Sequence, residues 1–106
     1  MMTTAERRVE KADKIGMDVA RFLEAADPWT FRQRLWPLET VNEGIRRKAM
    51  EARRHLLAGD ADIVVGWITE VEPRCDRCEK RANALIREVR SFRWGTFSRK
   101  HFGMRG

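Results

Sequence analysis

Basic and aromatic side chains are concentrated in the last 18 residues, which read VRSFRWGTFSRKHFGMRG from Val89 to Gly106. This stretch contains no acidic residue, and its cations are Arg90, Arg93, Arg99, Lys100 and Arg105. Its aromatic side chains are Phe92, Trp94, Phe97 and Phe102. The rest of the chain is close to charge balance, because it holds all 16 Asp and Glu residues. The basicity of the protein is therefore local.

This mixture suits contact with single-stranded nucleic acid, because cations track phosphates while flat rings stack on bases. Trp94 is the best stacking candidate, since it lies between Arg93 and the flexible Gly95. Phe92 continues an apolar helical stripe and is expected to be buried. Trp and Arg are also common hot spots of protein interfaces, so contact with a protein partner is the alternative.

A second group of arginines comes from the middle of the chain. If Ile45 faces the core of a helix, then at about 100° per residue Arg46 and Arg53 lie on one flank, while Arg47 and Arg54 point nearly opposite. Glutamates stand among them, so an ordinary solvated surface is the alternative to a secondary phosphate-binding surface. The candidate nucleic-acid-binding residues are Arg46, Arg47, Arg53, Arg54, Arg90, Arg93, Trp94, Arg99, Lys100, His101 and Arg105.

Cys75 and Cys78 form a CxxC pattern, which occurs both in zinc half-sites and in redox motifs. A zinc site needs two further ligands, and the candidates His55 and His101 come from different elements without finger-like spacing. Both cysteines also share an apolar stripe with Leu85, where Cys behaves as a small buried hydrophobe. We therefore expect a core position for them, with no metal and no cofactor.

The sequence lacks the patterns that most enzymes of this size use. It has no serine in a nucleophile-elbow motif and no glycine-rich phosphate loop. Its carboxylates are mostly interspersed with Lys and Arg, and no pair stands out for acid–base work. We expect a binding protein and not an enzyme.

The elements that must position these residues are predicted to be helices. A stripe at spacings of three and four predicts a first helix over Thr4–Ala26, with Thr3 and Glu6 as a capping box. Asp27 before Pro28 then predicts a short second helix. Trp29 and Trp36 are expected to be core aromatics that close the corner between two longer helices. An exposed stacking role is the alternative.

A third helix is predicted to begin at Pro37 or Thr40 and to end at Gly59, which suits a left-handed cap. Its apolar stripe is Leu38, Val41, Ile45, Ala49, Ala52 and Leu56. Residues 60–71 have the composition of a strand, but Val64, Trp67, Ile68 and Val71 fit helical spacing. We predict a buried helix there, with Trp67 as its core anchor.

The last long helix is predicted from Pro73 through Phe92, with the stripe Cys75, Cys78, Ala82, Leu85, Val89 and Phe92. Gly95 is the predicted stop, followed by a loop, and a hairpin turning at 95–96 is the alternative. The basic aromatic segment is accordingly 93–106. The fold class that follows is all-α, a compact bundle of about five to six helices in one domain spanning 1–106.

Composition limits the partners and the compartment. The chain has 106 residues, is 36% charged and carries a net charge of +6 with a pI near 10.1, which favours an anionic partner. Its longest apolar run, over 63–68, is far too short to span a bilayer. The first residues lack the apolar segment of a secretory signal. We expect a cytoplasmic protein with no membrane partner.

A chain of this size whose residues 2–16 read MTTAERRVEKADKIG, and which is helical in pattern and lacks a catalytic motif, resembles the small anti-CRISPR proteins of phages and mobile elements, in particular inhibitors of the type I-E Cascade complex. Many such inhibitors are acidic and imitate DNA, whereas this sequence is strongly basic. The resemblance therefore implies a different route, in which the protein occupies exposed single-stranded DNA, such as the displaced strand of the R-loop, and blocks nuclease recruitment. The alternative is a protein-binding inhibitor or adaptor that docks on an acidic groove of a partner.

Overall fold

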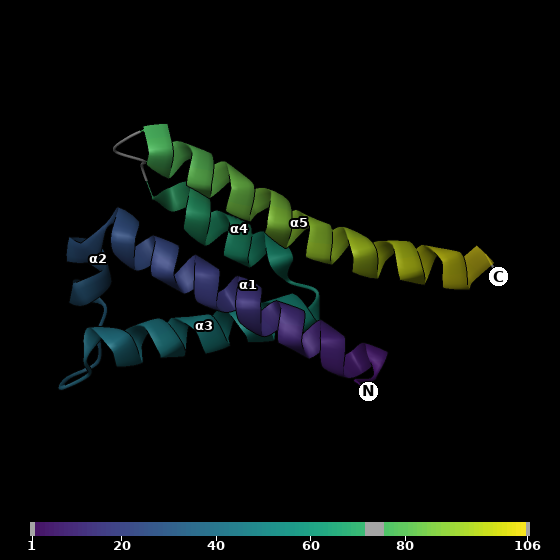
Figure 1. The fold of residues 1–106 in the computed structure, drawn as a ribbon, viewed down its shortest axis with the longest axis horizontal. Coiled ribbons are helices and arrows are strands. Elements are labelled where there is room, and N and C mark those ends of the chain that lie inside the picture. The colour runs from purple at the N-terminus through teal and green to yellow at the C-terminus, as the bar shows by residue number, and fades with distance from the viewer. Residues whose placement is uncertain (1, 72–75, 106) are drawn as a thin grey trace.

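The computed structural model describes the backbone of residues 2–71 and 76–105, and the side chains of 2–71 and 77–92. These residues form five α-helices and no strand, which confirms the predicted all-α bundle (Figure 1). The helices are α1 (Thr4–Ala26), α2 (Pro28–Gln33), α3 (Val41–Ala58), α4 (Ala61–Glu70) and α5 (Asp76–Arg105). None of the described helices is long and apolar enough to cross a membrane.

Local capping chemistry explains where the helices begin and end. The Thr3 hydroxyl accepts a hydrogen bond from the Glu6 N–H (3.1 Å) and donates one to the Glu6 carboxylate (3.2 Å). Thr40 and Glu43 repeat this arrangement at the start of α3. These caps satisfy backbone N–H groups that have no partner inside the helix. Gly59 ends α3 with a φ of 87°, as predicted for a left-handed cap.

The predicted choice of helix over strand for residues 60–71 is confirmed, because this stretch forms α4. Val64 and Ile68 of α4 are fully buried, and Trp67 is half-buried against the edge of the core. Trp67 therefore packs at the rim of the core instead of anchoring its centre.

The closest helix crossing lies between α1 and α3, which share the most extensive contact in the bundle (Figure 1). Gly16 is buried at this crossing. A Cβ atom built on Gly16 would lie 2.6 Å from the carbonyl oxygen of Ala49, a distance that backbone atoms do not tolerate. Only a glycine allows the two helices to approach this closely.

The core is made mainly of aliphatic side chains from α1, α3, α4 and α5, together with Phe22 and Phe92. Its fully buried large members are Ile15, Val19, Leu56, Val64, Ile68, Leu85 and Val89. On α5 the predicted stripe is confirmed for Ala82, Leu85, Val89 and Phe92, the last being 3% exposed. Cys78 is half-buried, and Cys75 lies outside the described residues.

Two predictions at the corner between α1 and α3 are wrong. Trp29 and Trp36 are 71% and 61% exposed, so they are not core aromatics. The six residues of α2, all of them described, include none that is buried, and it is Phe31 that packs against the core. Leu38 was expected on the stripe of α3, but α3 begins after Thr40, and Leu38 lies fully exposed in the preceding turn.

The last helix also differs from the prediction. α5 continues through Gly95 to Arg105, so neither the predicted stop at Gly95 nor the hairpin alternative is found. A glycine inside a helix costs about 1 kcal/mol, which lowers helix stability without forcing an end. In Figure 1 the last turns of α5 extend beyond the N-terminal end of α4.

Candidate nucleic-acid interface

The predicted site residues fall into two groups. Arg90 is exposed on the part of α5 whose side chains are described. The side chains of Arg93, Trp94, Arg99, Lys100, His101 and Arg105 lie outside the described residues, although their backbone belongs to α5. The predictions about these six side chains therefore remain predictions.

On α3, Arg47 is committed to contacts within the protein. Its Nε and one terminal nitrogen donate to the two carboxylate oxygens of Glu39, both at 2.9 Å. Its guanidinium also donates to the carboxylate of Glu51 (3.3 Å) and to the carbonyl oxygen of Arg34 (3.3 Å). Such a two-pronged pair is among the stronger polar contacts of proteins. Arg47 is therefore a structural residue, and we remove it from the candidate phosphate contacts.

The ionisation of this pair follows from the same geometry. The pKa of Glu39 is lowered from its ordinary value of 4.5, chiefly because Arg47 donates to its carboxylate; loss of solvent opposes this shift, and the Trp36 N–H supports it. The pKa of Arg47 is raised because Glu39 accepts its hydrogen bonds. Both groups are thus held in their charged forms at neutral pH.

The other three arginines of α3 differ in their surroundings. Arg53 donates to Asp13 at 3.0 Å and so links α3 to α1. Arg46 and Arg54 are exposed, and no ion pair is recorded for either among the described side chains. The predicted two-row surface on α3 therefore reduces to two available cations.

A basic row that the sequence analysis missed lies on the solvent side of α5. Lys80, Asn83, Arg87 and Arg90 are all exposed and recur at spacings of three, four and three. At about 100° per residue they lie roughly opposite the buried stripe of α5. From Lys80 to Arg90 the row spans about 15 Å. Glu79 is the acidic neighbour at its N-terminal end.

The sequence itself contains the signal for this basic row. Its four polar residues recur at helical spacing between the apolar residues of the core stripe. We call these four residues the α5 row.

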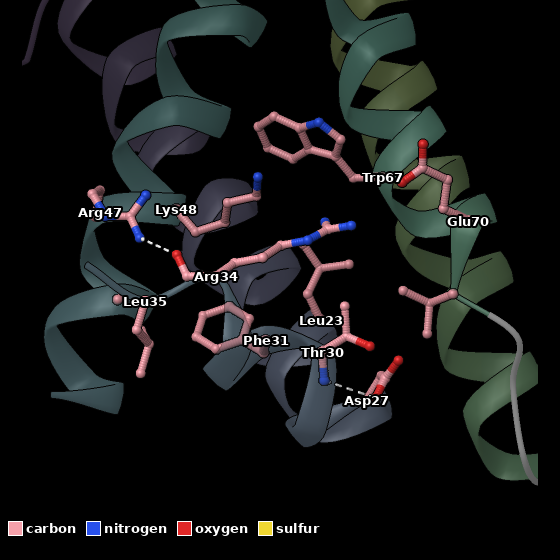
Figure 2. Close-up of a pocket in the computed structure, with 12 residues that line it drawn as sticks. Leu23, Asp27, Thr30, Phe31, Arg34, Leu35, Arg47, Lys48, Trp67 and Glu70 are labelled. Carbon is pink, nitrogen blue, oxygen red and sulfur yellow. Dashed lines mark hydrogen bonds between the residues drawn. The ribbon is translucent and has the colours of Figure 1, made fainter. Parts of the chain in front are cut away.

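A cavity of about 240 Å³ lies between α2, α3 and α4 (Figure 2). Phe31 and Trp67 form part of its wall, and the Arg34 side chain reaches across it in the close-up. Lys48 places its ammonium 3.8 Å from the centre of the Trp67 ring. Asp27 and Glu70 also line the space, so its charges are mixed and favour neither an anion nor a cation.

Among the described residues, no group of three or more His, Cys, Asp or Glu side chains comes together, and the side chains of Cys75 and His101 lie outside these residues. His55 packs edge-on against Trp67, with ring centres 5.5 Å apart. This contact places the imidazole at the rim of the core.

Comparison of the chain with protein-family models, with curated proteins and with solved structures finds no match. The geometry of the residues themselves is therefore the basis for the function proposed below.

Proposed function

We propose that this protein binds nucleic acid, with a preference for single-stranded DNA, along the solvent side of α5. The observation that carries the proposal is the α5 row, which lies on the same uninterrupted helix as residues 93–105 of the basic aromatic segment. A row of cations on a rigid helix holds its charges at fixed distances, which suits a chain of regularly spaced phosphates.

Helical register extends the α5 row toward the C-terminus. At about 100° per residue, positions 90, 94, 101 and 105 fall within one sector of roughly 60°. This sector continues the line of positions 80, 83 and 87, so that the whole row covers about 37 Å of helix. The sequence places Arg90, Trp94, His101 and Arg105 at these positions. Cations would hold the backbone of the strand, and Trp94 would stack on a base.

The proposal makes the protein an inhibitor that acts by occupancy, without catalysing a reaction. If it resembles the inhibitors of type I-E Cascade, the strand it covers is the displaced DNA of the R-loop. By the same register Arg99 and Lys100 fall on the other side of α5, beyond the last described buried residue, and they would add phosphate contacts where the strand turns around the end of the helix. Arg46 and Arg54 of α3 would give further support. The covered strand would then be closed to the nuclease that must be recruited to it.

The test is fluorescence anisotropy with a labelled 20-nucleotide single strand and the matching duplex, at low and at physiological salt. We expect tighter binding of the single strand. Replacing Lys80, Arg87 and Arg90 by Ala should weaken binding at least about tenfold, since each lost phosphate contact lowers affinity.

The matched control removes the same charge from α1 by replacing Lys11, Lys14 and Arg21, which are also exposed. It should change affinity by no more than about twofold. Absence of binding at low salt would refute the proposal. Equal losses in both triple variants would show that net charge, and not the side of α5, determines affinity.

A further inference from the structure

The turn between α2 and α3 contains a strained and fully exposed leucine. Leu38 has a φ of 66° and a relative exposure of 102%. A left-handed backbone costs a residue with a Cβ atom about 1 kcal/mol or more. Burial of the leucine side chain does not offset this cost, because the side chain is fully exposed to solvent. Strain of this kind is commonly found where a side chain must be presented to another molecule.

Arg47 holds this turn in place. Its guanidinium lies 4.2 Å from the centre of the Trp36 ring and binds both carboxylate oxygens of Glu39. The carboxylate of Glu39 in turn accepts a hydrogen bond from the Trp36 N–H at 3.1 Å. The two residues that flank 37–38 are thus fixed to the same arginine on α3. Because the turn is already ordered, little conformational entropy is lost when a partner binds it.

Next to the turn, the outer side of α3 forms a shallow groove of about 830 Å³. Trp36, Met50 and Leu57 contribute its apolar lining, with exposures of 61%, 62% and 38%. Met50 and Leu57 are seven residues apart and so lie on one side of the helix. In Figure 1 α3 lies at an edge of the bundle, with α1 as its main neighbour.

The unpaired charges of the groove are positive on balance. Arg47 is paired with Glu39 and Glu51, and Arg53 is paired with Asp13. Glu43 accepts a hydrogen bond from the hydroxyl of Thr40, which leaves its carboxylate charged. Arg46 and Arg54 outweigh this one carboxylate, and each lies four residues from Met50, on either side. Neither arginine forms an ion pair within the described part of the chain.

We propose that these residues dock a partner protein through an acidic amphipathic segment. We define the docking surface as Trp36, Leu38, Met50 and Leu57 together with Arg46 and Arg54. Apolar side chains of the partner would cover Trp36, Leu38 and Met50, and its carboxylates would meet the two arginines. Exposed Trp and Arg side chains of this kind are typical hot spots. The inference does not require nucleic-acid binding on α5, and Arg46 and Arg54 are the residues that both proposals use.

Two other occupants fit less well. A second copy pairing α3 antiparallel about a twofold axis at Met50 would place Arg46 of one copy beside Arg54 of the other, so like charges would meet. A nucleic acid needs flat rings for its bases. Here Arg47 already covers one face of Trp36, and Leu38 and Met50 are aliphatic.

The test is selection of random 16-residue peptides, displayed on phage, against the immobilised full chain, followed by affinity measurement with the enriched synthetic peptide. We expect the enriched peptides to carry acidic residues on either side of apolar ones.

Trp36→Ala and Met50→Ala should each lower the affinity for the enriched peptide at least about tenfold. Replacing both Arg46 and Arg54 by Ala should weaken peptide binding and reduce its dependence on salt. The matched control is Trp29→Ala, because Trp29 is also largely exposed but lies outside the docking surface.

Leu38→Gly tests the strain directly. It should weaken peptide binding while leaving the melting temperature unchanged or higher, because glycine adopts a positive φ without a Cβ clash.

Enriched peptides that bind equally well to the Trp36→Ala variant would overturn the proposal. So would a loss of single-stranded DNA affinity in the Trp36→Ala and Met50→Ala variants, which would assign this surface to nucleic acid. Failure of the α5 proposal would be seen separately, in the variants of Lys80, Arg87 and Arg90.

Discussion

Arg47 shows how a basic residue in a basic protein can serve the fold. Its guanidinium joins a carboxylate of the turn, a carboxylate of its own helix, the carbonyl of Arg34 and the ring of Trp36. With its charge neutralised in this way, it adds little to the attraction of phosphates. What it supports instead is the order of the α2–α3 turn, and through it the position of Leu38.

The pair of Arg47 and Glu39 should make stability depend on pH. The pKa of Glu39 is lower in the folded protein than its ordinary value of 4.5, so its stabilising contribution is present above that value. The contribution is lost as the pH falls through the lowered pKa. Melting temperatures of the wild type and of Glu39→Gln should therefore differ at neutral pH and converge in acid. The exposed Glu10→Gln variant serves as control, and a gap that is independent of pH would contradict the expectation.

Gly16 and Gly66 should respond in opposite ways to the same substitution. Gly16→Ala forces α1 and α3 apart, because the new Cβ would lie 2.6 Å from the Ala49 oxygen. We expect a loss of about 1–3 kcal/mol in the free energy of unfolding, measured by urea denaturation.

Gly66 of α4 has open space where a Cβ would be placed. Gly66→Ala should therefore raise stability by up to about 1 kcal/mol, through helix propensity alone. If the Gly16→Ala variant were as stable as the wild type, the α1–α3 crossing would have to be looser than it is in this structure.

At the scale of elements, α5 carries two different rows. Leu85, Val89 and Phe92 face the core, whereas Lys80 and Arg87 face solvent. Phe92 is the last buried residue of this row among the described side chains. The helix continues for a further 13 residues to Arg105. Up to Phe92 the stabilising residues and the proposed binding residues thus lie on opposite sides of one helix, and the proposed binding surface continues beyond Phe92.

Ending the chain after Thr96 should separate these two roles. This change removes Arg99, Lys100 and Arg105 but keeps one turn of helix after Phe92. We expect a melting temperature within a few degrees of the full chain and a clearly lower affinity for single-stranded DNA. Circular dichroism and anisotropy provide the two measurements. A large drop in melting temperature would instead assign the last turns of α5 to the fold.

At the scale of the whole molecule, the net charge of +6 overstates the charge that is available to a partner. Arg47 and Arg53 are paired internally, while the α5 row and residues 93–105 carry cations along one helix. The distribution of charge therefore matters more than its sum, because only clustered and unmatched cations release counterions on binding.

Binding of single-stranded DNA should accordingly weaken steeply with salt. For single strands the logarithm of affinity falls with the logarithm of salt concentration by about 0.7 per phosphate contact. Replacing Arg93, Arg99 and Lys100 by Ala should reduce the magnitude of this slope by about 2 while leaving helicity unchanged. Affinity that does not respond to salt, or an unchanged slope in the triple variant, would place the contact elsewhere.

The sequence by itself determined the helices and most of their ends. Thr3, Thr40 and Gly59 act through hydrogen bonds and backbone angles within a few residues, so their roles are visible in local sequence. The core stripes of α1 and α5 follow in the same way, because helical period sets which residues share a side. The basic character of the C-terminal segment also needs no structure to be seen.

Only the tertiary structure decided which side chains remain available at the surface. The turn before α3 brings Glu39 back against Arg47, which lies eight residues later in the sequence. Arg47 is therefore bound within the protein, and Trp36 is left exposed at the surface. No local sequence pattern encodes this contact. The end of α5 could not be predicted from Gly95 either, because a glycine permits a helix stop but does not require one. Exposure and pairing depend on elements that are distant in sequence, and packing is what brings them together.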